Sequence, residues 1–347
     1  MSIVGGIDRF QRRFPPVSMP LATIYKYGDD QGAYLAAIIS FYAFIGIFPL
    51  LLLATSILGF VLQDQPDLRA EVLNSALSNF PIVGDQLGRP EGIQGSVSAI
   101  VVGSIAALYG SMGLGLALQN AMNIAWAVPR NSRPNPFLLR FKSLVLLAAG
   151  GISVLAVTAV SVIGNNTEVF GALGLVGRLL ISLATILATG LVLSVLFRLS
   201  AARSHSLLAA LPGGLFAAAT WHGLQYAGAA YVTHVLGRTS QMNQTFGLVL
   251  GLMGLIYVAS IVVVLAIEVN VVLARRLYPR ALLTPFTDDV DLTDADKRAY
   301  TAYARAQRHK GFEEVTVVFK PVERDDADTV AMTTLRAEEL PGETGER

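Results

Sequence analysis

Cysteine is absent from this chain, and charged residues are scarce in it. Without a thiol the protein has no disulfide, no thiolate-bound zinc, no iron–sulfur cluster and no cysteine nucleophile. Asp, Glu, Lys and Arg make up 15% of the 347 residues, and hydrophobic residues make up 53%. Soluble globular proteins are roughly 45–50% hydrophobic and carry roughly 25% charged residues. Both departures indicate a protein that lives in a lipid bilayer.

Motifs for catalysis and for metal binding are also missing. No two of the four histidines lie four residues apart, and none stands in an H-x-H or H-E-x-x-H pattern that would hold zinc. The chain has no Gly-x-Ser-x-Gly nucleophile elbow and no Walker A loop. We therefore expect a protein that is not an enzyme and has no catalytic residue, metal or cofactor.

Six long apolar stretches dominate what is present. A helix needs about 20 apolar residues to cross a hydrocarbon core of about 30 Å. The sequence therefore predicts an all-α, polytopic membrane bundle of six transmembrane helices. Their approximate ranges are 33–62, 96–118, 143–163, 175–199, 207–232 and 246–273.

Lys and Arg fall almost entirely in alternate loops between these stretches. Thirteen basic residues flank the spans on one side and four on the other, which by the positive-inside rule places both termini in the cytoplasm. The thirteen are Arg9, Arg12, Arg13, Lys26, Arg130, Arg133, Arg140, Lys142, Arg198, Arg203, Arg275, Arg276 and Arg280.

Three regions follow from this pattern. Residues 1–32 form a cytoplasmic segment with a candidate interfacial helix at 20–30, and residues 33–276 form the transmembrane domain. Residues 277–347 form an acidic cytoplasmic tail, because from residue 288 onward there are 15 Asp and Glu against 9 Lys and Arg. In the tail, Thr293 and Asp296 predict a capping box that opens a helix to about Gln307. A short strand is predicted at 312–320, and the remainder is expected to be largely disordered.

Glu268 is the single acidic residue inside the six apolar stretches. Ionisable groups in a span are costly and are candidates for functional sites. Counting 1.5 Å per residue from Phe246 places Glu268 about 33 Å along its helix, near the cytoplasmic boundary. Two interpretations stay open: a structural ion pair with Arg275 or Arg198, or a site linked to protons or substrate.

Two further polar groups lie within the spans. Gln119 and Asn123 share a helix face at cytoplasmic depth, where they either bond neighbouring helices or line a vestibule. Trp221, His222 and Gln225 lie in the outward half of the fifth span. A polar stripe at that depth favours a wet or helix-facing surface over contact with lipid. We take all five as candidate substrate contacts, together with Glu268.

Small residues and prolines suggest where helices pack and bend. Glycine at helical spacing lets backbones approach closely in lipid, and proline inside a helix removes a ladder bond and produces a kink. The predicted packing positions are Gly247, Gly251 and Gly254 in the sixth span and Gly103 and Gly110 in the second; the predicted kinks or hinges are Pro49 and Pro212.

Several short motifs taken together resemble the YihY/BrkB family of bacterial inner-membrane proteins over roughly residues 20–285. The motifs are AAIISFYAF at 36–44, FPLL at 48–51, LPG at 211–213, EVN at 268–270 and RRLYPR at 275–280. The resemblance implies a six-helix inner-membrane protein of the cell envelope. It places Pro49, Pro212, Trp221 and Glu268 at recurring family positions and supplies no catalytic role. Members of this family have carried a ribonuclease BN-like label, which the missing metal motif argues against.

The sequence thus favours a membrane protein that binds or translocates an amphipathic, lipid-like envelope substrate. A structural or assembly factor of the envelope is the alternative, and a membrane-associated ribonuclease is a distant third. The expected partners are membrane lipids, with envelope-assembly proteins or a second copy of the chain as further candidates. No nucleic acid is expected as a partner, and the expected location is the inner (plasma) membrane.

Overall fold

The computed structural model describes residues 3–61, 97–164, 174–202, 205–234, 241–282, 284 and 290–320. In this part of the chain the secondary structure is entirely helical, as predicted. The long helices are α3 (Gly32–Val61), α6 (Val97–Ala125), α7 (Pro136–Gly164), α9 (Gly174–Ser200), α10 (Leu207–His234) and α11 (Gln241–Arg275). The shorter elements are α1 (Ile3–Arg13), α2 (Pro15–Asp29), the 3-10 turn η2 (Arg130–Ser132) and α12 (Asp294–Ala306).

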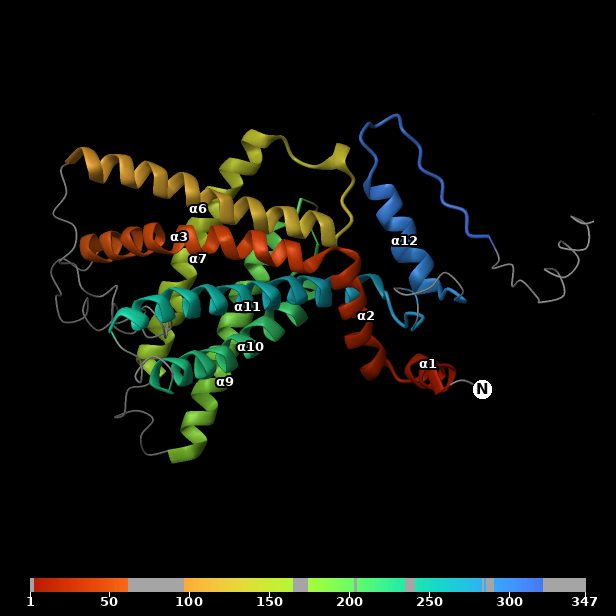
Figure 1. The fold of residues 1–347 in the computed structure, drawn as a ribbon, viewed down its shortest axis with the longest axis horizontal. Helices are drawn as coiled ribbons and strands as arrows, with labels where there is room; N and C mark the ends of the chain where they lie inside the picture. The colour runs from red at the N-terminus through yellow and green to blue at the C-terminus, as the bar shows by residue number, and fades with distance from the viewer. Residues whose placement is uncertain are drawn as a thin grey trace, which may run out of the picture.

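The long helices form one bundle with the short helices gathered at one of its ends. Figure 1 shows α3, α6, α10 and α11 running in a similar direction, with α7 and α9 crossing them. Helices α1, α2 and α12 lie together beyond the end where α3 begins and α11 finishes (Figure 1). The amino-terminal helices and the helix that follows the bundle therefore share one side.

The six long helices overlap the six apolar stretches that the sequence predicts as spans. By length and composition, four stretches within the described residues are able to cross a membrane: Pro136–Ser153, Leu179–Ser200, Leu207–Tyr231 and Val249–Arg275. The beginning of α3, Gly32–Gly46, is a shorter apolar stretch. Helices α3 and α6 are 30 and 29 residues long. Neither Pro49 in α3 nor Pro212 in α10 ends its helix, and the kinks stay predictions.

Helix α9 shows why this bundle needs an apolar solvent. Its large aliphatic side chains are 40–62% exposed along most of its length, which is more exposed apolar surface than water-soluble proteins tolerate. Lipid chains would cover these side chains without the free-energy cost of exposing them to water. They are Val176, Leu179, Leu180, Leu183, Leu187, Leu191, Val195 and Leu199.

The interior of the bundle is built largely from small residues. Hydrophobic association is weak between helices in lipid, so contact depends on backbones approaching closely enough for van der Waals packing. Alanine fills many of the fully buried positions where the long helices meet, and glycine allows the closest approaches. The buried alanines include Ala36, Ala117, Ala121, Ala210, Ala217 and Ala266.

Local sequence explains where two of the helices begin. Helix α7 starts at Pro136, and the Asn135 side chain accepts a hydrogen bond from the Leu138 backbone N–H at 2.8 Å. Helix α12 opens with the predicted capping box: Thr293 accepts from the Asp296 N–H, and the Asp296 side chain accepts from the Thr293 N–H. The prediction for the start of the tail helix is therefore confirmed.

The strand predicted at 312–320 is wrong. This segment has no regular secondary structure, and Phe312 and Val318 are 90% and 77% exposed. A strand needs a partner for its backbone hydrogen bonds, and none lies beside this segment within the described chain. The predicted disorder of the remaining tail falls on 321–347, outside the described residues.

Candidate functional sites: an intramembrane cavity and a buried ionic cluster

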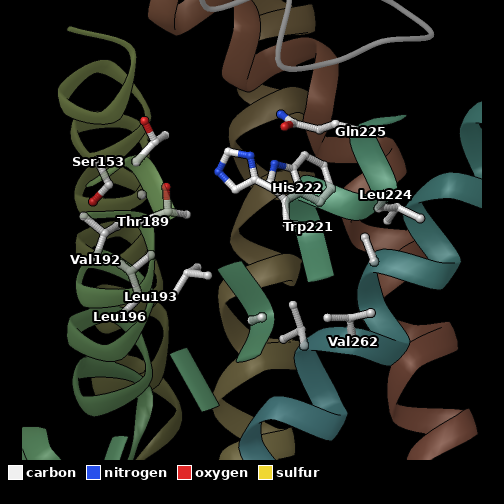
Figure 2. A pocket seen from close by; sticks show the side chains of 15 residues that line it. Ser153, Thr189, Val192, Leu193, Leu196, Trp221, His222, Leu224, Gln225 and Val262 are labelled. Carbon is white, nitrogen blue, oxygen red and sulfur yellow. The ribbon is translucent and has the colours of Figure 1, made fainter. Parts of the chain in front are cut away.

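A cavity of about 270 Å³ lies between α7, α9, α10 and α11. Trp221, His222 and Gln225, all predicted as substrate contacts, line it from α10. Figure 2 shows His222 directed from α10 toward the side of the cavity formed by α7 and α9, where Ser153 and Thr189 lie. The structure therefore brings the three outward-side candidates into one wall.

The cavity is mostly apolar, with its polar groups concentrated on α10. Two of its hydroxyl groups contribute little as donors, because Ser153 donates to the Ala149 carbonyl at 2.6 Å and Thr185 to the Ile181 carbonyl at 2.9 Å. Such back-bonding occupies the hydroxyl hydrogen within its own helix. The other polar side chains that line the cavity are Thr189 on α9 and Trp221, His222 and Gln225 on α10. The apolar lining includes Val192, Leu193, Leu196, Leu224, Val262 and Val263.

Glu268 does not line the cavity; it lies in a buried ionic cluster near the carboxyl end of α11. Its carboxylate is fully buried and lies 3.4 Å from Lys26 Nζ. Lys26 also contacts Asp30, at 2.5 Å, and both of those side chains are only 2% exposed. The predicted partners, Arg275 and Arg198, were wrong: the cation comes from α2, which lies across the end of α11 (Figure 1).

A second buried cation extends this cluster toward α12. Arg280, 1% exposed, contacts Asp29 at 3.0 Å and forms a shorter ion pair with Asp296. Burial acts to lower the pKa of Arg280, but the hydrogen bond to Asp296 and the charge of Asp29 outweigh it and leave that pKa raised. We call Lys26, Asp29, Asp30, Glu268, Arg280 and Asp296 the ionic cluster.

Tyr303 of α12 closes the cluster. Its ring lies 5.1 Å from Lys26 Nζ, and its hydroxyl donates to Asp29 at 3.4 Å. Burial and the negative charges of Asp30 and Asp29 raise the pKa of Tyr303, so its hydroxyl keeps its proton as a donor. Burial also raises the pKa of Asp29, although Arg280 acts in the opposite direction. The cluster joins α2, α11, the segment after α11 and α12.

The charges in the ionic cluster do not balance when every group is ionised. Within the cluster two cations face four carboxylates. An uncompensated buried charge is costly. The arrangement therefore favours the retention of a proton in the cluster.

Gln119 and Asn123 are buried rather than exposed to a vestibule. Gln119 Nε2 donates to the Gly115 carbonyl, to the Leu139 carbonyl and to Ser143 Oγ, at 2.9–3.1 Å. The last two partners belong to α7, so these bonds fit the helix-bridging interpretation. Asn123 is 3% exposed, and its Oδ1 has no hydrogen-bond partner within the described chain. The structure brings neither residue to the cavity or to the ionic cluster.

Asn270 is a site residue that sequence reasoning missed. Its Oδ1 accepts a hydrogen bond at 2.7 Å from the backbone N–H of Gly213, directly after Pro212. A proline inside a helix disturbs the backbone ladder around it, and here a side chain from α11 supplies a partner. A buried Asn in one span and a proline in another were the only signals, and neither identifies its partner.

The predicted packing glycines differ in their surroundings. A methyl group on Gly251 would collide with the Tyr231 ring, whose hydroxyl donates to the Gly247 carbonyl at 2.9 Å. A methyl group on Gly110 would lie 2.9 Å from Ile45. Gly254 is exposed with nothing near its Cβ position. Gly103 lies in α6, in a part where only the backbone is described.

We therefore expect Gly251→Ala and Gly254→Ala to have opposite effects in α11. Gly251→Ala forces the Tyr231 ring to move, and overpacking of this kind costs about 1–3 kcal/mol. Gly254→Ala meets no neighbour and gains up to about 1 kcal/mol from helix propensity. Thermal denaturation of both variants in the same detergent measures the difference. Equal stability of the two would show that α10 and α11 do not pack closely at Gly251.

No group of three or more His, Asp or Glu in the described residues has an arrangement suited to a metal ion. A family model described as Virulence factor BrkB matches residues 23–288. No curated protein and no solved structure matches the chain.

Proposed function

Because the chain belongs to the virulence factor BrkB family, we propose that it is a non-enzymatic inner-membrane protein that binds or translocates an amphipathic, lipid-like substrate. The observation that carries this proposal is the cavity between α7, α9, α10 and α11. All four helices contain candidate membrane spans. The cavity therefore lies within the depth of the bilayer, where lipids are the most abundant ligands.

The topology we propose has six spans with both termini in the cytoplasm. The four candidate spans together with α3 and α6 give the six crossings. An even number of crossings agrees with the gathering of α1, α2 and α12 at one end of the bundle (Figure 1). The excess of Lys and Arg in the loops on that side supports its assignment to the cytoplasm.

The cavity suits one apolar chain with a polar group at its edge. Ligand pockets in proteins begin at about 300 Å³ and combine apolar walls with a few polar groups that orient the ligand. A volume of about 270 Å³ holds part of a lipid, such as one acyl chain, rather than a whole molecule. In this proposal Trp221, His222 and Gln225 orient the polar part. Glu268 is a separate charge or proton site at the cytoplasmic end.

The direct test is lipid transfer by the full chain in liposomes. We expect Ala259→Leu, which fills the cavity from α11, and Gln225→Leu, which removes its amide, to slow transfer of a fluorescent phospholipid about tenfold, as a loss of about 1.4 kcal/mol implies. Ala229→Leu places the same leucine on an exposed part of α10 that does not line the cavity and should transfer like the wild type. Equal rates in all four proteins, or no transfer above protein-free liposomes, would reject the proposal.

Glu268→Gln in the same assay separates the role of the carboxylate from that of the cavity. We expect the variant to bind lipid like the wild type but to transfer it more slowly, since it can no longer exchange a proton. If Glu268→Gln transfers as fast as the wild type, the carboxylate has only a structural role.

A structural or assembly role is the second candidate, and two observations favour it. Gln119 bridges α6 to α7 with two hydrogen bonds, and the ionic cluster ties four segments together without facing the cavity. This role predicts that Glu268→Ala lowers thermal stability in detergent and that no added lipid raises it. A rise in melting temperature with lipid that Ala259→Leu abolishes would favour the transfer function instead.

A further inference from the structure

A second pocket, of about 510 Å³, lies at the end of the bundle where α6 and α11 finish and α12 passes. Four of the eight residues that line it are cations, and no Asp or Glu of the described residues lines it. We call it the basic pocket. Its lining residues are Ala127, Pro129, Arg275, Lys297, Arg298, Thr301, Ala302 and Arg305.

Helix α12 presents a basic face to this pocket because its other face is fixed. Ala295, Asp296 and Ala299 are buried against the bundle, and Asp296 pairs with Arg280. The remaining face places Lys297, Thr301 and Arg305 in one row at four-residue spacing. Lys297 and Arg305 are exposed. The helix is therefore held in a fixed orientation with these cations lining the pocket.

Two of the three guanidinium groups of the pocket, those of Arg275 and Arg298, donate to backbone carbonyls that hold them in place. Arg275 donates to the Trp126 carbonyl at 2.5 Å, and its guanidinium lies 5.6 Å from the centre of the Trp126 ring. Arg298 donates to the Arg276 carbonyl at 2.6 Å. Four like charges around one opening repel one another, and a bound anion would relieve that repulsion.

The depth of the pocket suggests the kind of anion. Arg275 is the last residue of the candidate span Val249–Arg275, and Ala127 is the second residue after the end of α6. Positions at the ends of spans lie at the level of lipid headgroups. Arg and Lys are the side chains that proteins use to bind phosphate, Arg through several parallel N–H donors and Lys as a point charge.

We propose that the basic pocket binds a phosphate group, carried by the headgroup of an anionic phospholipid or by a soluble phosphate compound. This site is separate from the intramembrane cavity and does not depend on the proposed transfer function. A phosphate seated here would contact α12 and the ends of α6 and α11 at once. It would thereby stabilise the position of α12 on the bundle.

Trp126 provides a reporter beside the pocket. The chain has two tryptophans, so Trp221→Phe leaves Trp126 as the single fluorescent indole, in contact with Arg275. We would titrate the full chain carrying Trp221→Phe, in a non-ionic detergent, with sodium pyrophosphate and separately with phosphatidylglycerol. Phosphatidylcholine serves as the zwitterionic comparison. We expect a saturable change in Trp126 emission that weakens as salt is added.

Two double variants decide whether the pocket is responsible. Lys297→Gln with Arg305→Gln removes two pocket cations, whereas Lys310→Gln with Lys320→Gln removes two exposed cations outside it. At about fivefold in affinity per cation, we expect the first pair to weaken binding about twenty-five-fold and the second to leave it unchanged.

Three outcomes support the proposal and identify the ligand's source. Binding of both probes shows that the phosphate group suffices, binding of phosphatidylglycerol alone identifies a lipid headgroup, and binding of pyrophosphate alone identifies a soluble ligand. The absence of a saturable response to either probe would overturn the proposal. An equal loss of binding in the two double variants would overturn it as well.

Discussion

Replacing Lys26 by methionine should lower the free energy of unfolding by about 3–5 kcal/mol, the cost of breaking a buried ion pair by removing one partner. Lys26 contacts Asp30 and Glu268, and all three side chains are at most 2% exposed. Methionine retains the length of the aliphatic chain but leaves both carboxylates without their cation. Denaturation in mixed micelles, followed by circular dichroism, measures the loss.

The exposed ion pair on α1 provides a matched control. Asp8 and Arg12 have the same four-residue spacing and a 2.7 Å contact, but their side chains are 21% and 34% exposed. Surface pairs of this kind contribute about 0–1 kcal/mol, so Arg12→Met should have little effect. Adding Glu268→Gln to Lys26→Met removes one of the two stranded charges and should restore part of the stability. Equal losses for Lys26→Met and Arg12→Met would mean that the ionic cluster is solvated.

The sequence was sufficient to predict the long helices and the start of α12 because their signals are local. A run of about 20 apolar residues reports a helix long enough to cross a bilayer wherever it packs. The capping box of Thr293 and Asp296 is similarly confined to one turn. The shared position of Trp221 and Gln225 was also predictable from a local signal, because four-residue spacing puts two side chains on one helix face.

Pairings between distant segments could not be predicted in this way. The positive-inside rule counts Lys26 and Arg280 as flanking cations and contains no information about their contacts. The structure instead buries both, one against Glu268 of α11 and the other against Asp296 of α12. An acidic residue near a span boundary had several cations within reach, and only the crossing of α2 over α11 decides among them. The wrong strand at 312–320 has a related cause, since its β propensity is local and a partner strand is not.

Gly213 is the position where the packing of α10 against α11 should be most sensitive to an added methyl group. Its Cβ would overlap the backbone oxygen of Ala266 and the side chain of Asn270. Backbone oxygen cannot move aside as a flexible side chain does. We therefore expect Gly213→Ala to separate α10 from α11 locally and to weaken the 2.7 Å hydrogen bond from the Gly213 N–H to Asn270. Overpacking and the lost bond together should cost about 2–4 kcal/mol.

Gly223, on the same helix, separates this effect from intrinsic helix propensity. It is exposed and has nothing within 4 Å of its Cβ position, so Gly223→Ala should gain up to about 1 kcal/mol from helix propensity alone. Melting temperatures of the two variants in one detergent should therefore move in opposite directions. Asn270→Ala tests the bond without the steric clash and should cost about 1 kcal/mol, because it removes the acceptor of the buried Gly213 N–H. If Gly213→Ala and Gly223→Ala are equally stable, the close approach of α10 to α11 is wrong, and with it the wall that α10 and α11 contribute to the cavity.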